Sequence, residues 1–350
     1  MEAISAKIYS HAHYDAGEDA NLIFELTNHT KKDVHILKWN TPLEGWKSDC
    51  LQVSKNGKAV AYDGRLVKRG QPKPKDFLVL KKGESISKKV NVGEVYNMTN
   101  SGRVKVNFKP DKLVYLQQTP TQESLMSAPA QKKTGKSIKV IARPAIFSLT
   151  GKGKGRQTDG EKARSLERKK TSLKKKVKAG INQGLISVAL PCKTVGGSAG
   201  RKTIAKKAHQ NGYGLTSAVL TAMANNPDYK TWFGSYAKTR FKKVRTDYQN
   251  IKSEFETKVF TYDLTGKNCD DGDYAYTYKG TTTIWLCSAF WSAPATGSDS
   301  QAGTMVHEHS HASAYTDDLA YGPTDCMKLA KTHPAEAIRN ADSHEYYSKG

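Results

Sequence analysis

The sequence has few cysteines and no long apolar run. Its 350 residues include five cysteines, none in a C-x-x-C pair, so a zinc site built from thiolates is not expected. No stretch approaches the roughly 20 apolar residues of a membrane-spanning helix. Residues 1–7 lack the apolar core of a signal peptide. We therefore expect no membrane span, and a protein secreted by means of an export signal that this sequence does not include.

The few cysteines still predict a disulfide pattern. Cys269 and Cys287 bracket a predicted hairpin and are expected to form one bridge. Cys192 and Cys326 would form a second bridge by elimination. Cys50 stands alone in the N-terminal half and is expected to be the free thiol. Bridges of this kind indicate an oxidising compartment.

Acidic residues are also scarce relative to basic ones. The chain has 56 Lys and Arg against 33 Asp and Glu, a formal net charge of +23. A balance of this kind usually indicates binding to nucleic acid, an anionic membrane surface or an acidic partner. However, much of the excess lies in residues 151–180, without the interleaved aromatic residues that a stacking platform requires. We therefore expect no nucleic-acid partner. The alternative function that remains open is a basic nucleic-acid or glycan-binding module with a vestigial metal site.

The pattern along the chain predicts three segments and an α+β fold class. Residues 1–148 contain short alternating runs separated by turn residues and are expected to form an all-β, sandwich-like domain. Residues 149–180 are expected to be an extended, lysine-rich linker, with at most transient helix over 161–178. Residues 181–350 predict a mainly helical domain with a small sheet. Its expected helices are 205–224, 236–256, 303–314, 324–331 and 335–344, and its expected strands are 259–264, 274–278 and 283–287.

The most informative motif is the run from His307 to His311. These two histidines are four residues apart, so a helix places both imidazoles on one face, where they can bind one zinc ion. Glu308 is placed to act as the general base. A catalytic zinc site needs a third protein ligand. Asp318, seven residues beyond His311, is the best candidate for that ligand.

Several blocks around this motif resemble one known family. They are residues 231–236, 287–291, 296–304 and 340–346, together with Asp318 and Tyr321-Gly322. In this order they resemble the aspzincin (deuterolysin) metallopeptidases, and most of all the peptidyl-Lys metalloendopeptidase branch. The resemblance covers roughly residues 190–350. It implies a zincin-type catalytic domain.

The resemblance also implies roles for matched residues. The implied Zn²⁺ ligands are His307, His311 and Asp318, and Glu308 would be the general base. The gap between His311 and the aspartate is shorter than in the family, which leaves Asp317 as the alternative ligand; Asp318 is favoured because it keeps the family's spacing to Tyr321. Tyr321 would donate a hydrogen bond to the oxyanion. Asp342 and Glu345 would bind a substrate lysine, so that peptide bonds are cut on the amino side of Lys in protein and peptide substrates.

The N-terminal half resembles the propeptide of bacterial toxin-like members of this family. We therefore predict a secreted, monomeric zymogen whose own prodomain is an intramolecular inhibitor. In this hypothesis the prodomain or linker inserts a lysine or a metal-blocking group into the cleft. The enzyme is expected to cut its own linker between Lys169 and Lys178.

Overall fold

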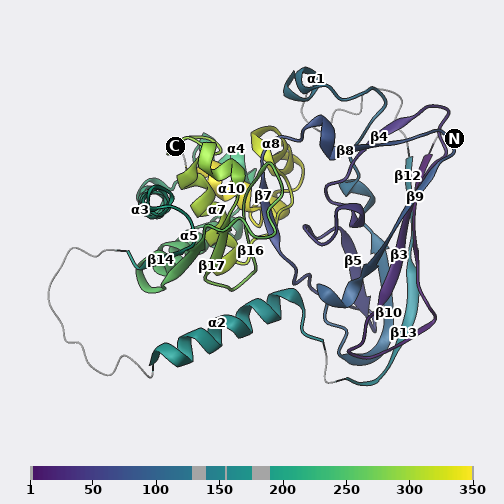
Figure 1. Ribbon diagram of the computed structural model, residues 1–350. Helices are drawn as coiled ribbons and strands as arrows, with labels where there is room; N and C mark the ends of the chain where they lie inside the picture. Colours follow the sequence, from purple (N-terminus) through teal and green to yellow (C-terminus); the bar gives the residue numbers. More distant parts are fainter. Residues whose placement is uncertain (1–2, 128–138, 154–155, 176–189, 349–350) are drawn as a thin grey trace, which may run out of the picture. The chain divides into compact units, whose positions relative to one another are not determined.

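The computed structural model describes residues 3–127, 139–153, 156–175 and 190–348 (Figure 1). The chain divides into two compact units. The first consists of residues 1–65 and 71–162, and the second of residues 66–70 and 163–350. The second unit therefore includes five residues from far upstream in the sequence.

The first unit is built from β-sheets, as predicted for the N-terminal half. Alternation of buried and exposed residues along its strands gives each sheet an apolar face, as in β3, where Leu22, Phe24 and Leu26 are buried. The sheet orders are β12-β1-β3-β9, β2-β13-β10-β5-β6 and β11-β4-β8. The strands are β1 (Ala3–Tyr9), β2 (His13–Asp15), β3 (Asn21–Asn28), β4 (Val34–Leu37), β5 (Leu51–Lys55), β6 (Lys58–Ala59), β8 (Phe77–Leu80), β9 (Ser85–Asn91), β10 (Asn100–Phe108), β11 (Tyr115–Leu116), β12 (Lys139–Arg143) and β13 (Ala145–Lys152), and a short helix is α1 (Gln122–Ser127).

The second unit combines helices with one five-stranded sheet, and the mixed α+β prediction is confirmed. Its helices are α3 (Ala199–Ala222), α4 (Pro227–Phe233), α5 (Lys238–Thr257), α6 (Ser288–Ser292), α7 (Gln301–Ser313), α8 (Gly322–Thr332), α9 (Pro334–Ala337) and α10 (Ala341–Tyr347). The sheet order is β14 (Cys192–Val195), β15 (Phe260–Asp263), β17 (Thr283–Leu286), β16 (Asp273–Thr277) and β7 (Leu66–Arg69). Among the described residues, no helix is long and apolar enough to cross a membrane.

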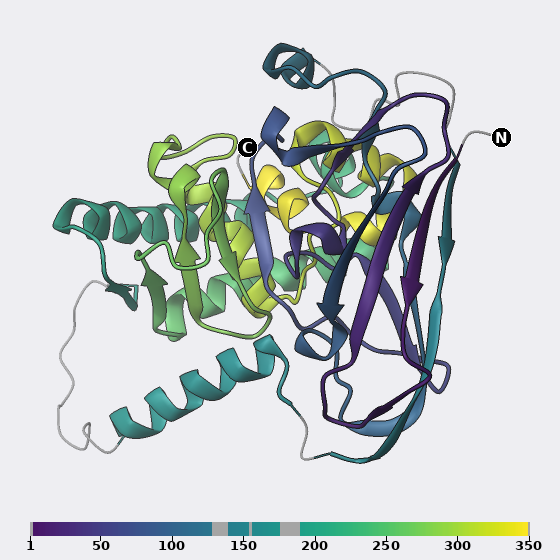
Figure 2. The same cartoon turned by 45° about the vertical axis from the view of Figure 1, so that its right-hand side comes forward.

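The edge strand β7 was not predicted from the sequence. It pairs antiparallel with β16, with Val67 opposite Tyr276 and Lys68 opposite Ala275. In Figures 1 and 2 it is the blue strand beside the green strands of this sheet. The predicted boundary after residue 148 therefore misses a segment inside 1–148 that belongs to the sheet of the second unit.

The lysine-rich segment differs from its prediction, because helix α2 (Asp159–Lys175) replaces the expected extended chain. The helix begins with a capping box. The Thr158 hydroxyl accepts from the Glu161 amide, and the Glu161 carboxylate accepts from the Thr158 amide. Further along, the Glu167 carboxylate accepts hydrogen bonds from the Thr282 amide and the Thr283 hydroxyl. The prediction of an extended segment is therefore wrong for 159–175, and residues 176–180 lie outside the described residues.

The cysteines follow the prediction only in part. The Cys269–Cys287 disulfide is present and Cys50 is a buried free thiol, so both predictions are confirmed. The Cys192–Cys326 pairing is wrong, because both residues are free thiols. Cys326 is buried in α8, where its thiol lies 3.6 Å from the Ala320 carbonyl oxygen and 3.3 Å from the Asn340 side-chain nitrogen. Cys326 is thus a buried thiol with polar partners of its own, and it does not need a disulfide partner.

Loss of the one disulfide should destabilise the second unit. The bridge joins cysteines 18 residues apart in sequence. A loop of this size contributes about 3 kcal/mol, mainly by restricting the unfolded chain. Replacing both Cys269 and Cys287 with Ser is expected to lower the free energy of unfolding by about 2–4 kcal/mol in denaturant titrations. Cys192→Ser is the matched control, and an equal loss there would contradict an effect of the bridge.

Candidate active site

Helix α7 provides the framework of the site, and its residues 302–312 are all buried. The Ser300 hydroxyl caps its N-terminus by accepting a hydrogen bond from the Gly303 amide at 2.9 Å. The helix packs against α3, α5 and α10. Gly303 is necessary for the last contact, because a Cβ there would lie 2.5 Å from the Glu345 Oε1 atom of α10. A small residue therefore lets a charged side chain approach the helix.

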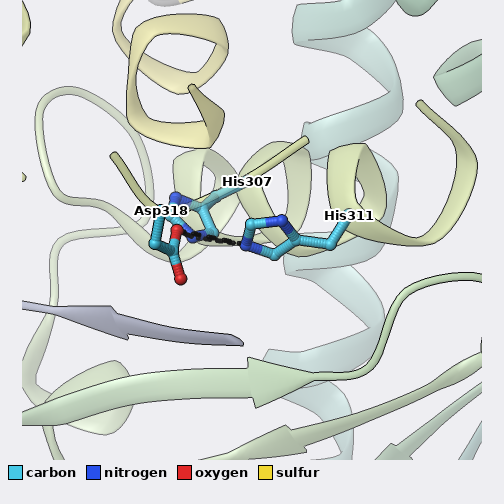
Figure 3. A group of neighbouring side chains, drawn as sticks. All are labelled: His307, His311 and Asp318. Atoms are coloured by element: carbon cyan, nitrogen blue, oxygen red, sulfur yellow. Dashed lines mark hydrogen bonds and ion pairs between the residues drawn. The ribbon is translucent and has the colours of Figure 1, made fainter. Parts of the chain in front are cut away.

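His307, His311 and Asp318 meet at one point, as Figure 3 shows. The Nε2 atoms of the two histidines are 3.1 Å apart. The Oδ1 atom of Asp318 lies 3.2 Å from the His307 Nε2 atom and 3.3 Å from the His311 Nε2 atom. Zinc bonds of about 2.0–2.1 Å at tetrahedral angles place ligand atoms roughly 3.3 Å apart. Three buried ligand atoms at nearly this spacing fit zinc, with three protein ligands as in a catalytic site.

Each histidine is oriented through its other ring nitrogen. The Nδ1 atom of His307 lies 2.7 Å from the Asp342 Oδ1 atom. The Nδ1 atom of His311 lies 3.0 Å from the Thr316 carbonyl oxygen. A proton held on Nδ1 leaves the Nε2 lone pair available to a metal, and such outer partners fix the ring orientation.

The electrostatics of the cluster also suit a cation. Burial opposes a charge on His307, but the carboxylates of Asp318 and Asp342 outweigh it and raise the pKa of His307 to about 10. Asp318 is itself buried, yet the two imidazoles hold its pKa well below the usual range. The cluster therefore favours a positive charge between its members, as metal ligands should.

Glu308 lies directly beside the first histidine and is fully buried. Among the described residues, neither oxygen of its carboxylate has a hydrogen-bond partner. Burial raises the pKa of Glu308 to about 8. A carboxylate in this environment can accept a proton and give it up again near neutral pH.

Two neighbouring candidates take other roles. Asp317 forms ion pairs with Lys279 and Arg339 and lies outside the cluster. His309 points away from the cluster and its ring stacks on Phe255 at 3.8 Å. The third histidine of the motif is therefore a packing residue.

Asp342 and Glu345 are both buried on α10, and they surround Lys68 of β7. The Lys68 ammonium lies 2.5 Å from Glu345 and 3.5 Å from Asp342. In addition, the Val67 amide donates a hydrogen bond to the Asp318 Oδ2 atom at 3.0 Å. Strand β7 thus contacts both the predicted lysine site and a predicted metal ligand. No local sequence signal marks Lys68, because it is one of many lysines in the chain.

Tyr321 lies at the N-terminal cap of α8. The adjacent Gly322 amide donates a hydrogen bond to the Asp342 Oδ2 atom at 2.8 Å. This bond ties the backbone next to Tyr321 to the carboxylate that orients His307. The oxyanion role of Tyr321 stays a prediction.

Comparisons with known proteins relate the chain to one family of metallopeptidases. Residues 218–349 match the aspzincin family model, which is described as "Lysine-specific metallo-endopeptidase". The chain is 30% identical to an "Extracellular protease" of Aeromonas hydrophila, over 95% of this chain and 88% of that protein. It is also 30% identical to a "Peptidyl-Lys metalloendopeptidase" of Armillaria mellea, over 95% of this chain and 87% of that protein. A solved zinc peptidase from Grifola frondosa shares 37% identity over 44% of this chain and 96% of its own, with a TM-score of 0.41.

The matched region includes the whole cluster and both carboxylates of α10. Two relatives extend over nearly the full chain, the β-rich first unit included. The predicted enzyme class and the predicted zinc cofactor are confirmed by these matches. The chain therefore belongs to the aspzincin family and is a zinc-dependent metalloendopeptidase.

Proposed function

We propose that this enzyme cleaves peptide bonds on the amino side of lysine. One observation supports this most directly: a lysine side chain already lies in a carboxylate-lined site beside the metal cluster. The Lys68 side chain is fully buried against Asp342 and Glu345. Val67, the residue before it, contacts the metal ligand Asp318. A substrate bound in the same way would have its lysine in the carboxylate site and the preceding peptide bond next to the metal.

In the proposed mechanism, each residue has a distinct task. Bound zinc supplies Lewis acidity that lowers the pKa of water and polarises the scissile carbonyl. Glu308 accepts the proton of the attacking water and later passes it to the leaving amine. The Tyr321 hydroxyl donates to the carbonyl oxygen as negative charge develops there. Asp342 and Glu345 hold the lysine ammonium, which would be costly to bury without counter-charges.

We further propose that the chain is a zymogen, with residues 1–148 as prodomain, 149–180 as activation segment and 181–350 as catalytic domain. Strand β7 is the proposed inhibitor, because it pairs with β16 and places Lys68 in the lysine site. Its Val67 amide is bonded to Asp318, an oxygen donor that the metal also needs. This contact favours inhibition over cleavage of the strand. Secretion is proposed as well, since one relative is an "Extracellular protease".

The role of Glu308 can be tested with Glu308→Gln, which keeps the shape of the side chain but removes the base. We expect kcat on a lysine-containing peptide to fall by about 10²–10⁴-fold, the usual contribution of a general base. Zinc content, measured by elemental analysis, should stay at the wild-type value because Glu308 is not a ligand. Wild-type kcat in the zinc-loaded variant would refute the assignment.

Inhibition by β7 can be tested with Lys68→Met in the full chain. Methionine keeps much of the length but loses the charge. The carboxylates then no longer attract the side chain at position 68, so a substrate lysine should be able to displace it from the lysine site. We expect the zinc-loaded variant to cleave a short lysine peptide faster than the uncleaved wild-type chain, in an assay of initial rates. Lys89→Met, at an exposed position of β9, is the matched control. Equal rates for all three proteins would contradict inhibition by this strand.

Self-processing predicts a defined new N-terminus. A substrate segment must be extended in order to pair with β16 as β7 does. Residues up to Lys175 are helical, so they are not in the conformation that cleavage requires. We therefore expect the zinc-loaded wild-type chain to cut next to the last lysines of the segment Lys169–Lys178, and Glu308→Gln to stay intact. Mass spectrometry of the products locates the cut. Maturation of pure Glu308→Gln at the same bond would show that another protease is responsible, and a fragment beginning at Lys68 would show that β7 is a substrate.

A further inference from the structure

The lysine site contains a third carboxylate that the sequence did not predict. Asp299 Oδ1 lies 3.2 Å from the Lys68 ammonium, closer than Asp342 at 3.5 Å and second to Glu345 at 2.5 Å. All four residues belong to the second unit. Glu345 and Asp342 come from α10, whereas Asp299 precedes the first turn of the zinc helix α7. The ammonium is therefore approached by carboxylates from two separate elements.

Asp299 is held in place from two sides. Its backbone has a φ of +50°, in the left-handed region, and the next residue, Ser300, caps α7. The Tyr346 hydroxyl donates a hydrogen bond to Asp299 Oδ1 at 2.6 Å. The rings of Tyr274 and Tyr346 lie 5.2 Å and 5.8 Å from the Lys68 ammonium, within reach of cation–π attraction. Two aromatic rings and a fixed carboxylate thus form one side of the lysine site.

Asp299 also differs from the other two carboxylates in exposure. Its side chain is 33% exposed, whereas those of Asp342 and Glu345 are 1% and 0% exposed. Asp299 therefore forms the outer rim of the site. A lysine entering from solvent would meet this carboxylate before it reaches Glu345.

Asp342, in contrast, is already committed to other partners. Its Oδ1 atom lies 2.7 Å from His307 Nδ1, and its Oδ2 atom accepts from the Gly322 amide at 2.8 Å. Its separation from the lysine ammonium is longer than either of these. The nearest counter-charges of the ammonium are therefore Glu345 and Asp299, whereas the nearest partners of Asp342 are His307 and Gly322.

We propose that Asp299 is a specificity-determining residue that closes the lysine site from outside, while Asp342 is a positioning residue for His307. This inference rests on the proposed cleavage at lysine. Three carboxylates converging on one point suit the three N–H donors of a compact ammonium. Arginine presents a planar, wider fork whose donors diverge, and it fits such a point less well. Loss of Asp299 removes one counter-charge and leaves two, so substrate binding weakens while the chemical step is preserved.

The kinetic test uses the full chain, loaded with zinc, with Lys68→Met present throughout so that the site is open. Two peptides differ only in lysine or arginine after the cleaved bond. Asp299→Asn is expected to raise KM for the lysine peptide about tenfold, the size of one partly exposed charge-assisted hydrogen bond. The value of kcat should change less than about twofold, and Asp299→Glu should restore much of the affinity, since only ground-state binding is affected.

Two further variants separate the three carboxylates. Asp228→Asn removes an equal charge at an exposed position of α4 and should leave KM unchanged. Asp342→Asn is expected to lower zinc affinity about 10–100-fold, as for other partners that orient a metal-bound histidine, whereas Asp299→Asn should not. An unchanged lysine KM in Asp299→Asn, or equal zinc loss in both variants, would overturn the proposal.

A measurement of stability tests the same contact without catalysis. With Lys68 present, Asp299→Asn should lower Tm by on the order of 2–4 °C, because it removes a counter-charge from a buried ammonium. In the Lys68→Met background the same change should leave Tm unchanged or raise it, because carboxylate repulsion is relieved. Identical shifts in both backgrounds would refute the contact. If no variant cleaves at lysine but the two shifts differ, the lysine site stands and the proposed cleavage fails.

Discussion

The catalytic unit depends on balancing negative charge in its interior. Glu308, Asp342 and Glu345 are fully buried beside one another, and Asp318 is nearly so. A buried carboxylate without a counter-charge costs several kcal/mol, so the site requires cations. The cluster of His307, His311 and Asp318 is suited to Zn²⁺, and the Lys68 ammonium supplies a further positive charge near Asp342. Binding of a metal and binding of a lysine therefore satisfy one shared requirement of the fold.

This requirement explains why helix α7 has its unusual sequence. A helix buried on all sides ordinarily consists of apolar residues, yet α7 includes three histidines and a glutamate. The position of each histidine on the helix decides its environment. His307 and His311 lie on the face with Asp318, whereas His309 lies on another face and packs against Phe255. The Tyr262 hydroxyl bonds His309 Nε2 at 2.9 Å and His209 Nδ1 at 2.6 Å. The same residue type is thus a proposed metal ligand on one face and a hydrogen-bonded core residue on the other.

Sequence alone could predict what depends on local spacing. The four-residue interval between His307 and His311, the alternation along β3 and the hairpin between Cys269 and Cys287 each leave a periodic or positional signal. The family resemblance added Tyr321, Asp342 and Glu345, which lie apart from the motif in sequence.

The features missed from the sequence depend on long-range pairing. Strand β7 lies more than 200 residues before its partner β16, and its short Leu-Val-Lys-Arg sequence has no alternation that would mark it. Pairing of Cys192 with Cys326 was inferred by elimination, which fails when a thiol has polar partners of its own. Helix α2 depends on the contacts of Glu167 with Thr282 and Thr283, and charge repulsion alone could not predict them.

Asp342 links the two halves of the site. One of its oxygens contacts the ring of His307, a proposed zinc ligand, and the other accepts a hydrogen bond from the Gly322 amide beside Tyr321. A lysine that draws on this carboxylate therefore acts on the residues that hold the metal as well as on its own binding site. Because Asp299 and Glu345 provide nearer charges for the ammonium, Asp342 can keep its bonds to His307 and Gly322 while a lysine is bound. In this proposal Asp299 and Glu345 bind the ammonium, and Asp342 orients His307. A strongly acidic lysine site can then lie next to the metal cluster, because the bound lysine does not draw Asp342 away from His307.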